Sequence, residues 1–320
     1  MSSQNHEVRD LLTQTVRDLV AKHADPEAVR AAMDSPRGYD EKLWQLLCEQ
    51  VGAAALVIPE DLGGAGGELA DAAAVLTELG RALVPTPLLG TTLAELALLA
   101  AEDPDTDALE SLAAGESIGA VVFDPAYVVN GDIADVVIAV DGDNLTRWTE
   151  FSAQPATTMD PTRRLAGVTA GASAPLGTDP GIADAAALLL AAEAVGAATR
   201  CLELTVAYTK ERVQFGRPIG SFQALKHRMA DLYVKVQTAG AVVDEAVSAP
   251  SPTSAALALF TAAEAFRDTA AEAVQMHGGI AITAESDIQL YFKRAHGIAQ
   301  LLGQPAELLR RLEADAFSEA

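Results

Sequence analysis

One long helical stretch constrains this chain more than any other feature. The sequence from Ala183 to Arg212 contains no Pro and consists largely of Ala and Leu, which are among the strongest helix formers. Its apolar residues are distributed almost all round the expected helix rather than along one stripe. A helix of this kind must be buried on more than one side, so the sequence predicts a core helix in a bundle and favours bundle-to-bundle packing in an oligomer.

The chain divides into three zones around this helix. Helical patterns occupy residues 7 to about 112 and about 180 to the end, whereas short Val and Ile runs between Asp-Pro, Asn-Gly and Asp-Gly turns fill residues 116–172. A β unit of under 60 residues cannot bury a core alone and must pack on its neighbours. We expect a mainly α protein with an N-terminal helical domain (1–112), a small truncated β domain (113–176) and a C-terminal four-helix bundle (177–320).

Charge and cysteine usage limit the classes of partner. The formal net charge of -23 repels nucleic acid and anionic lipid, so an anionic ligand would need a locally basic site. The N-terminus lacks the apolar core of a signal peptide, and Glu193 interrupts the longest apolar run. Cys48 and Cys201 match no disulfide or metal pattern, so we expect reduced thiols in helices, no metal site and a cytoplasmic protein.

The stretch "RVQFGRPIGSFQALKHRMAD" (212–231) carries the most specific pattern. Gly216 is expected to end the long helix, Pro218 prevents its continuation, and a new helix restarts near Ser221. Arg212 therefore lies in the last turn before the break. A planar guanidinium suits paired phosphate oxygens, although a surface arginine beside a turn is the simpler alternative.

A second stretch, "AVQMHGGIAI" (273–282), contains adjacent glycines. Gly278 and Gly279 would let the backbone approach a ligand closely and present unshielded N–H groups to phosphate. Taken alone, this pair is better explained as a helix-ending turn, which would occur in any bundle.

Together with "LVIPEDLGGAGG" (56–67), these two stretches follow the order found in the acyl-CoA dehydrogenase family, which the chain resembles over most of its length. The family consists of flavoproteins that act on CoA thioesters, so the resemblance implies FAD as cofactor. It further implies that Arg212 reaches the FAD pyrophosphate and that the adenine end lies against Phe215 and Gln223. In the family these segments serve an FAD held mainly by a neighbouring subunit, which gives this cofactor-binding set: Arg212, Phe215, Gln223, Gln275, Gly278 and Gly279.

The β zone departs from the family pattern. It is about half the usual length, and we find no Thr/Ser-rich loop of the kind that hydrogen-bonds the flavin ring. The segment "DPTRRLAGV" (160–168) carries Arg163 and Arg164. We interpret these two cations as surface residues rather than ligands of CoA phosphates.

The catalytic base is the second departure. Family members remove the α-proton with a carboxylate while hydride passes to the flavin, and the expected Glu position is occupied by Leu302. In some members the base lies on the first long bundle helix, at a position that falls here at about Ala186. The nearest acids are Asp184, which suits a helix start, and Glu193, expected to pair with Arg200 or to line a subunit contact.

This combination resembles the shortened subunit of the heteromeric acyl-CoA dehydrogenases of actinobacterial steroid catabolism. The resemblance implies an α2β2 assembly in which a full-length partner supplies the base, FAD lies at the interface and electron-transfer flavoprotein is the acceptor. The substrates would be steroid-derived CoA thioesters, which belongs to lipid metabolism and cholesterol degradation. Two alternatives stay open: a self-sufficient homomeric enzyme using Asp184 or Glu193, and a degenerate structural partner.

Overall fold

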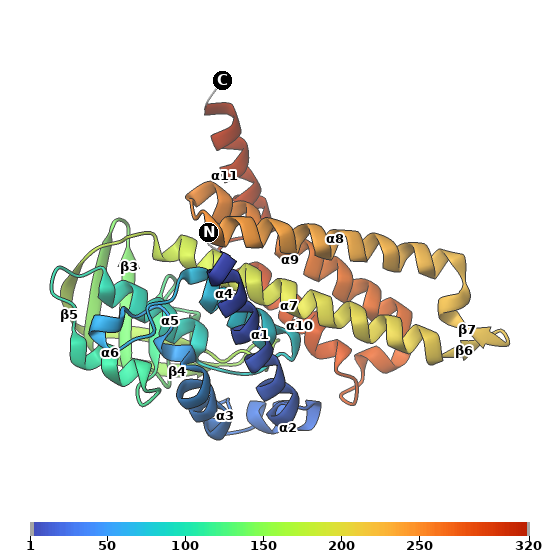
Figure 1. The fold of residues 1–320 in the computed structure, drawn as a ribbon, viewed down its shortest axis with the longest axis horizontal. Helices are drawn as coiled ribbons and strands as arrows, with labels where there is room; N and C mark the ends of the chain where they lie inside the picture. The colour runs from blue at the N-terminus through green and yellow to red at the C-terminus, as the bar shows by residue number, and fades with distance from the viewer. Residues whose placement is uncertain (1–2, 319–320) are drawn as a thin grey trace.

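The computed structural model describes the backbone of residues 3–318 and the side chains of residues 7–313. Helices dominate, and a small sheet follows the N-terminal helices in chain order and lies at one end of the molecule, while the C-terminal bundle extends to the other end (Figure 1). This arrangement confirms the predicted fold class. The N-terminal part contains six α-helices: α1 (Ser3–His23), α2 (Pro26–Met33), α3 (Glu41–Leu46), α4 (Leu69–Arg81), α5 (Leu88–Leu99) and α6 (Thr106–Ala113).

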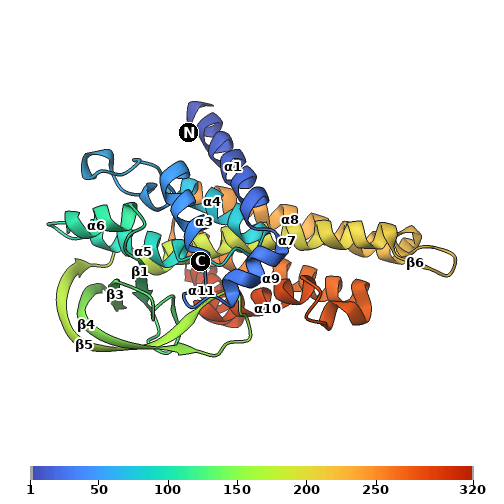
Figure 2. The same ribbon diagram turned by 90° about the horizontal axis from the view of Figure 1, so that it is seen from below.

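The central sheet has five strands in the order β1-β3-β4-β5-β2. β1 and β3 are parallel, and the remaining pairings are antiparallel. The long β4–β5 ribbon contains register shifts that curve it (Figure 2). The strands are β1 (Gly119–Val122), β2 (Val128–Val129), β3 (Val136–Asp141), β4 (Asn144–Ala156) and β5 (Leu165–Thr178).

The two faces of the sheet bury different residues because side chains alternate along a strand. Val121 and Ile138 join the main core, which is continuous with the helices, while Val122 and Val137 belong to a second, much smaller cluster. Helix α5 packs directly on β1. The sheet therefore depends on its helical neighbours for burial, as its length predicts.

The C-terminal bundle is built around α7 (Ile182–Glu211), α8 (Gln223–Ser248), α9 (Pro252–His277) and α10 (Ile288–Leu301), and α11 (Pro305–Ser318) follows. Helix α7 packs against α4 on one side and against α8, α9 and α10 on the others. It is the one described helix that is long and apolar enough to cross a bilayer, and most of its apolar stretch is buried inside this protein. Burial on several sides explains its unstriped composition.

The chain reverses after α7 through a short hairpin. β6 (Val213–Gln214) pairs with β7 (Arg217–Pro218), and the two turn residues, Phe215 and Gly216, both have positive φ. Such turns match the twist of a hairpin but disfavour bulky residues. The predicted interruption of the helix is confirmed, but α7 ends at Glu211 and Gly216 lies in the hairpin turn that follows; α8 begins at Gln223 after a single 3₁₀ turn. The hairpin and the sheet lie at opposite ends of the molecule (Figures 1 and 2).

Candidate functional site

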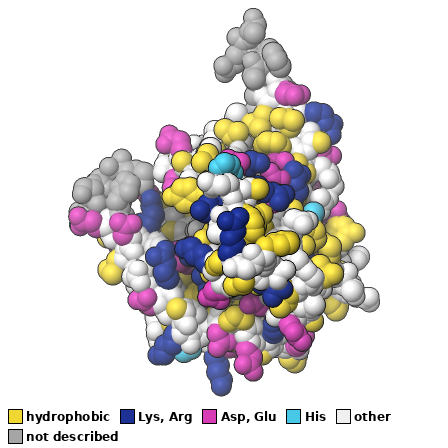
Figure 3. Space-filling view, turned by 90° about the vertical axis from the view of Figure 1, so that its right-hand side faces the viewer, with side chains coloured by type: hydrophobic (Ala, Val, Ile, Leu, Met, Phe, Trp, Pro, Cys, Tyr) yellow, Lys and Arg dark blue, Asp and Glu magenta, His cyan; other side chains and the backbone are white. Residues whose placement is uncertain are grey.

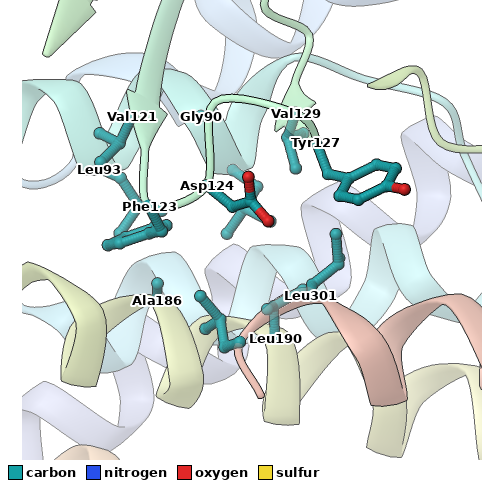
Figure 4. Close-up of a pocket in the computed structure, with 12 residues that line it drawn as sticks. Gly90, Leu93, Val121, Phe123, Asp124, Tyr127, Val129, Ala186, Leu190 and Leu301 are labelled. Carbon is teal, nitrogen blue, oxygen red and sulfur yellow. The ribbon is translucent and has the colours of Figure 1, made fainter. Parts of the chain in front are cut away.

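The two positions at which the family places its base meet in one pocket. Ala186 comes from α7 and Leu302 from the end of α10, and both line a cavity of about 30 Å³. Leu89, Phe123 and Leu190 close much of the remaining wall, and Figure 4 shows Ala186, Leu190 and Leu301 facing the end of β1. A volume of this size holds about one or two waters, whereas ligand pockets usually measure about 300–1,000 Å³.

Asp124 is the one carboxylate among the residues that line this pocket. It follows β1 in an Asp-Pro turn, is exposed, and accepts a hydrogen bond at Oδ1 from the Ala126 N–H (2.9 Å). Asp124 was not among the candidate residues predicted from the sequence, although an acidic residue directly after a buried strand is a recognisable pattern for a site residue. Its hydrogen bond within the turn gives it a local structural role.

The two acids considered as substitute bases lie elsewhere. Asp184, in the first turn of α7, has an oxygen 3.6 Å from a nitrogen of Arg311. The Gly181 and Ile182 N–H groups that begin the helix are capped by Asp179 instead. Asp184 is therefore an acidic residue of the first turn, where it interacts favourably with the helix dipole. It does not line the narrow pocket.

The expected pairing of Glu193 with Arg200 is wrong. Glu193 is buried and accepts hydrogen bonds from Arg163 and Arg294, whereas Arg200 pairs with Glu203 (3.2 Å). Burial works to raise the pKa of Glu193, but the two guanidiniums outweigh burial and lower the pKa. A carboxylate held ionised between two cations is a poor proton acceptor, so this geometry argues against Glu193 as the base.

The interpretation of Arg163 and Arg164 as surface cations is also wrong. Arg163 is buried against Glu193, and Arg164 donates to Asp132 from Nε (2.9 Å). Asp160 joins the same buried group by accepting from Arg294 (2.7 Å). The loop between β4 and β5 uses its charged residues to attach the sheet to the bundle, which a sequence pattern cannot reveal because the partners are distant in sequence.

The six residues expected to contact FAD lie at the opposite end of the bundle, and all are exposed. Arg212 caps α7, and Gly278 ends α9 with a φ of 67°. The Tyr208 hydroxyl donates to the His277 carbonyl (3.3 Å), which places the two motif segments side by side. The set comprises Arg212, Phe215, Gln223, Gln275, Gly278 and Gly279.

This end of the bundle is locally basic. Residues 210–228 contain five of the 22 Lys and Arg residues of the chain and one acid, Glu211. Figure 3 faces this end and shows Lys and Arg side chains gathered near its middle among apolar side chains. In a protein with a net charge of -23, such a local excess of cations meets the requirement for an anion site.

Three features of this end leave groups open to a ligand. Among the described residues, no hydrogen bond or ion pair to the Arg212 guanidinium is found. A Cβ added at Gly279 would meet no atom within 4 Å, and φ at Gly279 is not positive. Phe215, at φ 53° in the hairpin turn, is 92% exposed, and its ring meets that of Phe222 edge to face with centroids 6.1 Å apart. A cation, a bare backbone and an exposed ring together fit the groups of a dinucleotide.

The narrow pocket and the basic end are far apart. Ala186 lies near the start of α7 and Arg212 directly after its end. The 26 residue steps from Ala186 to Arg212 correspond to about 39 Å at the rise of an α-helix. One extended dinucleotide is too short to connect the two places, so they do not belong to the same centre.

Comparison with known proteins agrees with the fold. The family profiles of the acyl-CoA dehydrogenase N-terminal and C-terminal domains match residues 6–116 and 182–315, respectively. Over 311 residues the chain is 70% identical to the acyl-CoA dehydrogenase IpdE2 of Mycobacterium tuberculosis, covering 97% of this chain and 98% of that protein.

Solved structures give the same result. A chain of the Tcur3481-Tcur3483 steroid acyl-CoA dehydrogenase (G363A variant) superposes with a TM-score of 0.88 at 27% identity, covering 98% of this chain and 99% of that one. A chain of the ChsE4-ChsE5 complex from Mycobacterium tuberculosis gives a TM-score of 0.86 at 24% identity, with coverages of 99% and 98%. On the fold, both domain matches and the IpdE2 similarity, this chain belongs to the acyl-CoA dehydrogenase family.

Proposed function

We propose that this chain is the auxiliary subunit of a heteromeric, FAD-dependent acyl-CoA dehydrogenase that introduces an α,β double bond into a CoA thioester. Its basic bundle end contributes contacts to the pyrophosphate and adenine of an FAD at a subunit interface. A full-length family member in an α2β2 assembly supplies the catalytic base and the reactive end of the site.

The separation of about 39 Å along α7 carries this proposal. Residues suited to a dinucleotide phosphate lie at one end of the helix, and the narrow pocket in which Ala186 and Leu302 occupy the family's base positions lies at the other. An FAD gripped by Arg212 must therefore place its flavin outside this chain's own pocket. The partner chain is the place that remains for it.

The residues of this chain divide the cofactor contacts among them. The Arg212 guanidinium pairs with phosphate oxygens, and the backbone at Gly278 and Gly279 approaches the same group without steric interference. Phe215 and Gln223 lie against the adenine, and Gln275 adds a hydrogen-bonding side chain beside the glycine turn. FAD, when bound, supplies the hydride acceptor for the dehydrogenation.

The substrate class follows from the relatives. One superposed chain comes from the Tcur3481-Tcur3483 steroid acyl-CoA dehydrogenase, and the other comes from the ChsE4-ChsE5 complex. We therefore propose a steroid-derived CoA thioester, a role in cholesterol degradation, electron-transfer flavoprotein as acceptor and a cytoplasmic location.

The test is to purify the chain alone and together with a full-length acyl-CoA dehydrogenase partner, and to measure FAD per polypeptide. The isolated chain should retain little FAD, and the complex should contain FAD and dehydrogenate the thioester. Arg212→Ala should lower the FAD content of the complex. Arg200→Ala, an exposed arginine of the same helix about 18 Å away, should leave it unchanged.

Stoichiometric FAD and turnover in the isolated chain would overturn the proposal and support a self-sufficient enzyme. Asp184→Asn and Glu193→Gln would then identify its base. An unchanged FAD content in the Arg212→Ala complex would instead support a purely structural partner.

A further inference from the structure

Two rings join the segments that we propose to bind the FAD phosphates. The side chains of Tyr208 and His277 stack with their ring centroids 4.1 Å apart and their planes inclined by 21°. The Tyr208 hydroxyl also donates a hydrogen bond to the His277 carbonyl oxygen (3.3 Å). Both residues are half-buried, so this contact is partly shielded from water.

Each ring is connected directly to one half of the proposed clamp. The Tyr208 carbonyl accepts the Arg212 N–H (2.9 Å), which fixes the backbone from which the guanidinium extends. His277 immediately precedes Gly278, and its Nδ1 lies 2.8 Å from the Ala273 carbonyl oxygen, which anchors the ring on α9. Burial lowers the pKa of His277, so the ring is neutral at neutral pH and adds no charge beside Arg212.

The contact matters because the two halves are distant in sequence and otherwise exposed. Arg212 and Gly278 are 66 residues apart along the chain, and both are exposed at the bundle end. A Cβ at Gly278 would have no neighbour within 4 Å, so nothing packs against the open side of this glycine. A binding site works only when its groups are held in place by supporting residues.

We propose that Tyr208 and His277 are positioning residues that set the separation between the Arg212 guanidinium and the backbone of Gly278 and Gly279, so that both grip one pyrophosphate. This inference rests on the proposed function. Neither Arg212 nor Gly278 can fix its distance from the other segment by itself, and the proposal assigns this role to the two rings.

The test measures the equilibrium affinity of the apo-complex for FAD by titration with FAD. Tyr208→Leu, which removes the stack and the hydroxyl, should weaken binding about tenfold or more, as loss of supporting residues does at other sites. Tyr208→Phe keeps the stack and should weaken binding less. His277→Gln, which removes the other ring, should resemble Tyr208→Leu and serves if that variant does not fold. Tyr127→Leu removes an exposed tyrosine beside the narrow pocket and should have no effect.

A double-mutant cycle separates positioning from general stability. In the Arg212→Ala background, Tyr208→Leu should cost clearly less affinity than in the wild type, because the role of Tyr208 is exerted through Arg212. Equal losses in both backgrounds, or no loss from Tyr208→Leu and His277→Gln, would overturn this inference while leaving the proposed function intact. No loss from Arg212→Ala would instead refute the proposed function.

Discussion

At the scale of single residues, Glu95 is the most exceptional group in the protein. It lies on α5 with no exposed surface, and neither carboxylate oxygen has a hydrogen-bond partner among the described residues. Burial raises the pKa of Glu95 well above its ordinary value. Burial, and then the charge of Glu95, raises the pKa of the nearby Cys48 thiol to about 12. Burial therefore favours the neutral, protonated form of both groups.

Replacing Glu95 by Gln should change the pH dependence of stability. The raised pKa means that protonated Glu95 contributes fully below the unfolded-state pKa of about 4.3 and that this contribution is lost as pH rises toward the folded-state pKa. In denaturant unfolding, the advantage of Glu95→Gln should therefore grow by up to about 1.4 kcal/mol per pH unit above that point. The exposed Glu110→Gln should show no such trend, and parallel curves for Glu95→Gln and wild type would contradict the prediction.

Residue-level prediction from the sequence succeeded where local pattern was sufficient. Cys48 and Cys201 are free and buried, and the Phe-Gly-Arg-Pro pattern marks the reversal of the chain between α7 and α8. It failed for Glu193 and Arg163, because a charged residue in an apolar helix can be buried only if a distant partner compensates it. Nothing near Glu193 in the sequence identifies Arg294 as that partner.

At the scale of elements, the contact between α4 and α7 depends on two glycines. A Cβ at Gly196 would lie 2.0 Å from the Thr77 carbonyl oxygen, and one at Gly80 would lie 2.3 Å from that of Glu193. The missing side chains let the two backbones approach closely. The helices themselves were predictable from composition, and α7 begins one residue before the expected start. The pairing of α4 with α7 was not predictable, since the spacing of apolar residues does not specify which helices pack together.

Gly196→Ala should lower the free energy of unfolding by about 1–3 kcal/mol, because overpacking outweighs the better helix propensity of Ala. Gly240 in α8 is a matched control, since its added Cβ would make an ordinary contact 3.6 Å from Val195 Cγ1. Gly240→Ala should therefore raise stability by about 0.5–1 kcal/mol. Chemical denaturation measures both, and a stabilising Gly196→Ala would rule out the close helix contact.

At the scale of the whole molecule, one buried ionic group attaches the sheet to the bundle. Glu193 on α7 meets Arg294 on α10 and Arg163 on the loop between β4 and β5. Asp160 and Thr162 of the same loop complete the hydrogen bonding of Arg294. The two cations and two acids balance in charge, so the group is stable only as a whole.

Glu193→Gln should therefore lower the free energy of unfolding by about 3–5 kcal/mol, because it leaves the buried Arg163 guanidinium without its counter-ion. Glu203→Gln, at an exposed pair with Arg81 and Arg200, should cost less than about 1 kcal/mol. Urea unfolding of the two variants provides the comparison. Similar small losses in both, or lost turnover in Glu193→Gln with unchanged stability, would contradict a structural role for Glu193.

The narrow pocket between Ala186 and Leu302 also has a consequence for the relative amounts of the two proposed subunits. If every turnover takes place in the other polypeptide, surplus copies of this chain add no capacity, while a shortage leaves flavins poorly held. Dehydrogenase activity is then highest when the two subunits are made in equal amounts, so coordinated synthesis of both is an advantage.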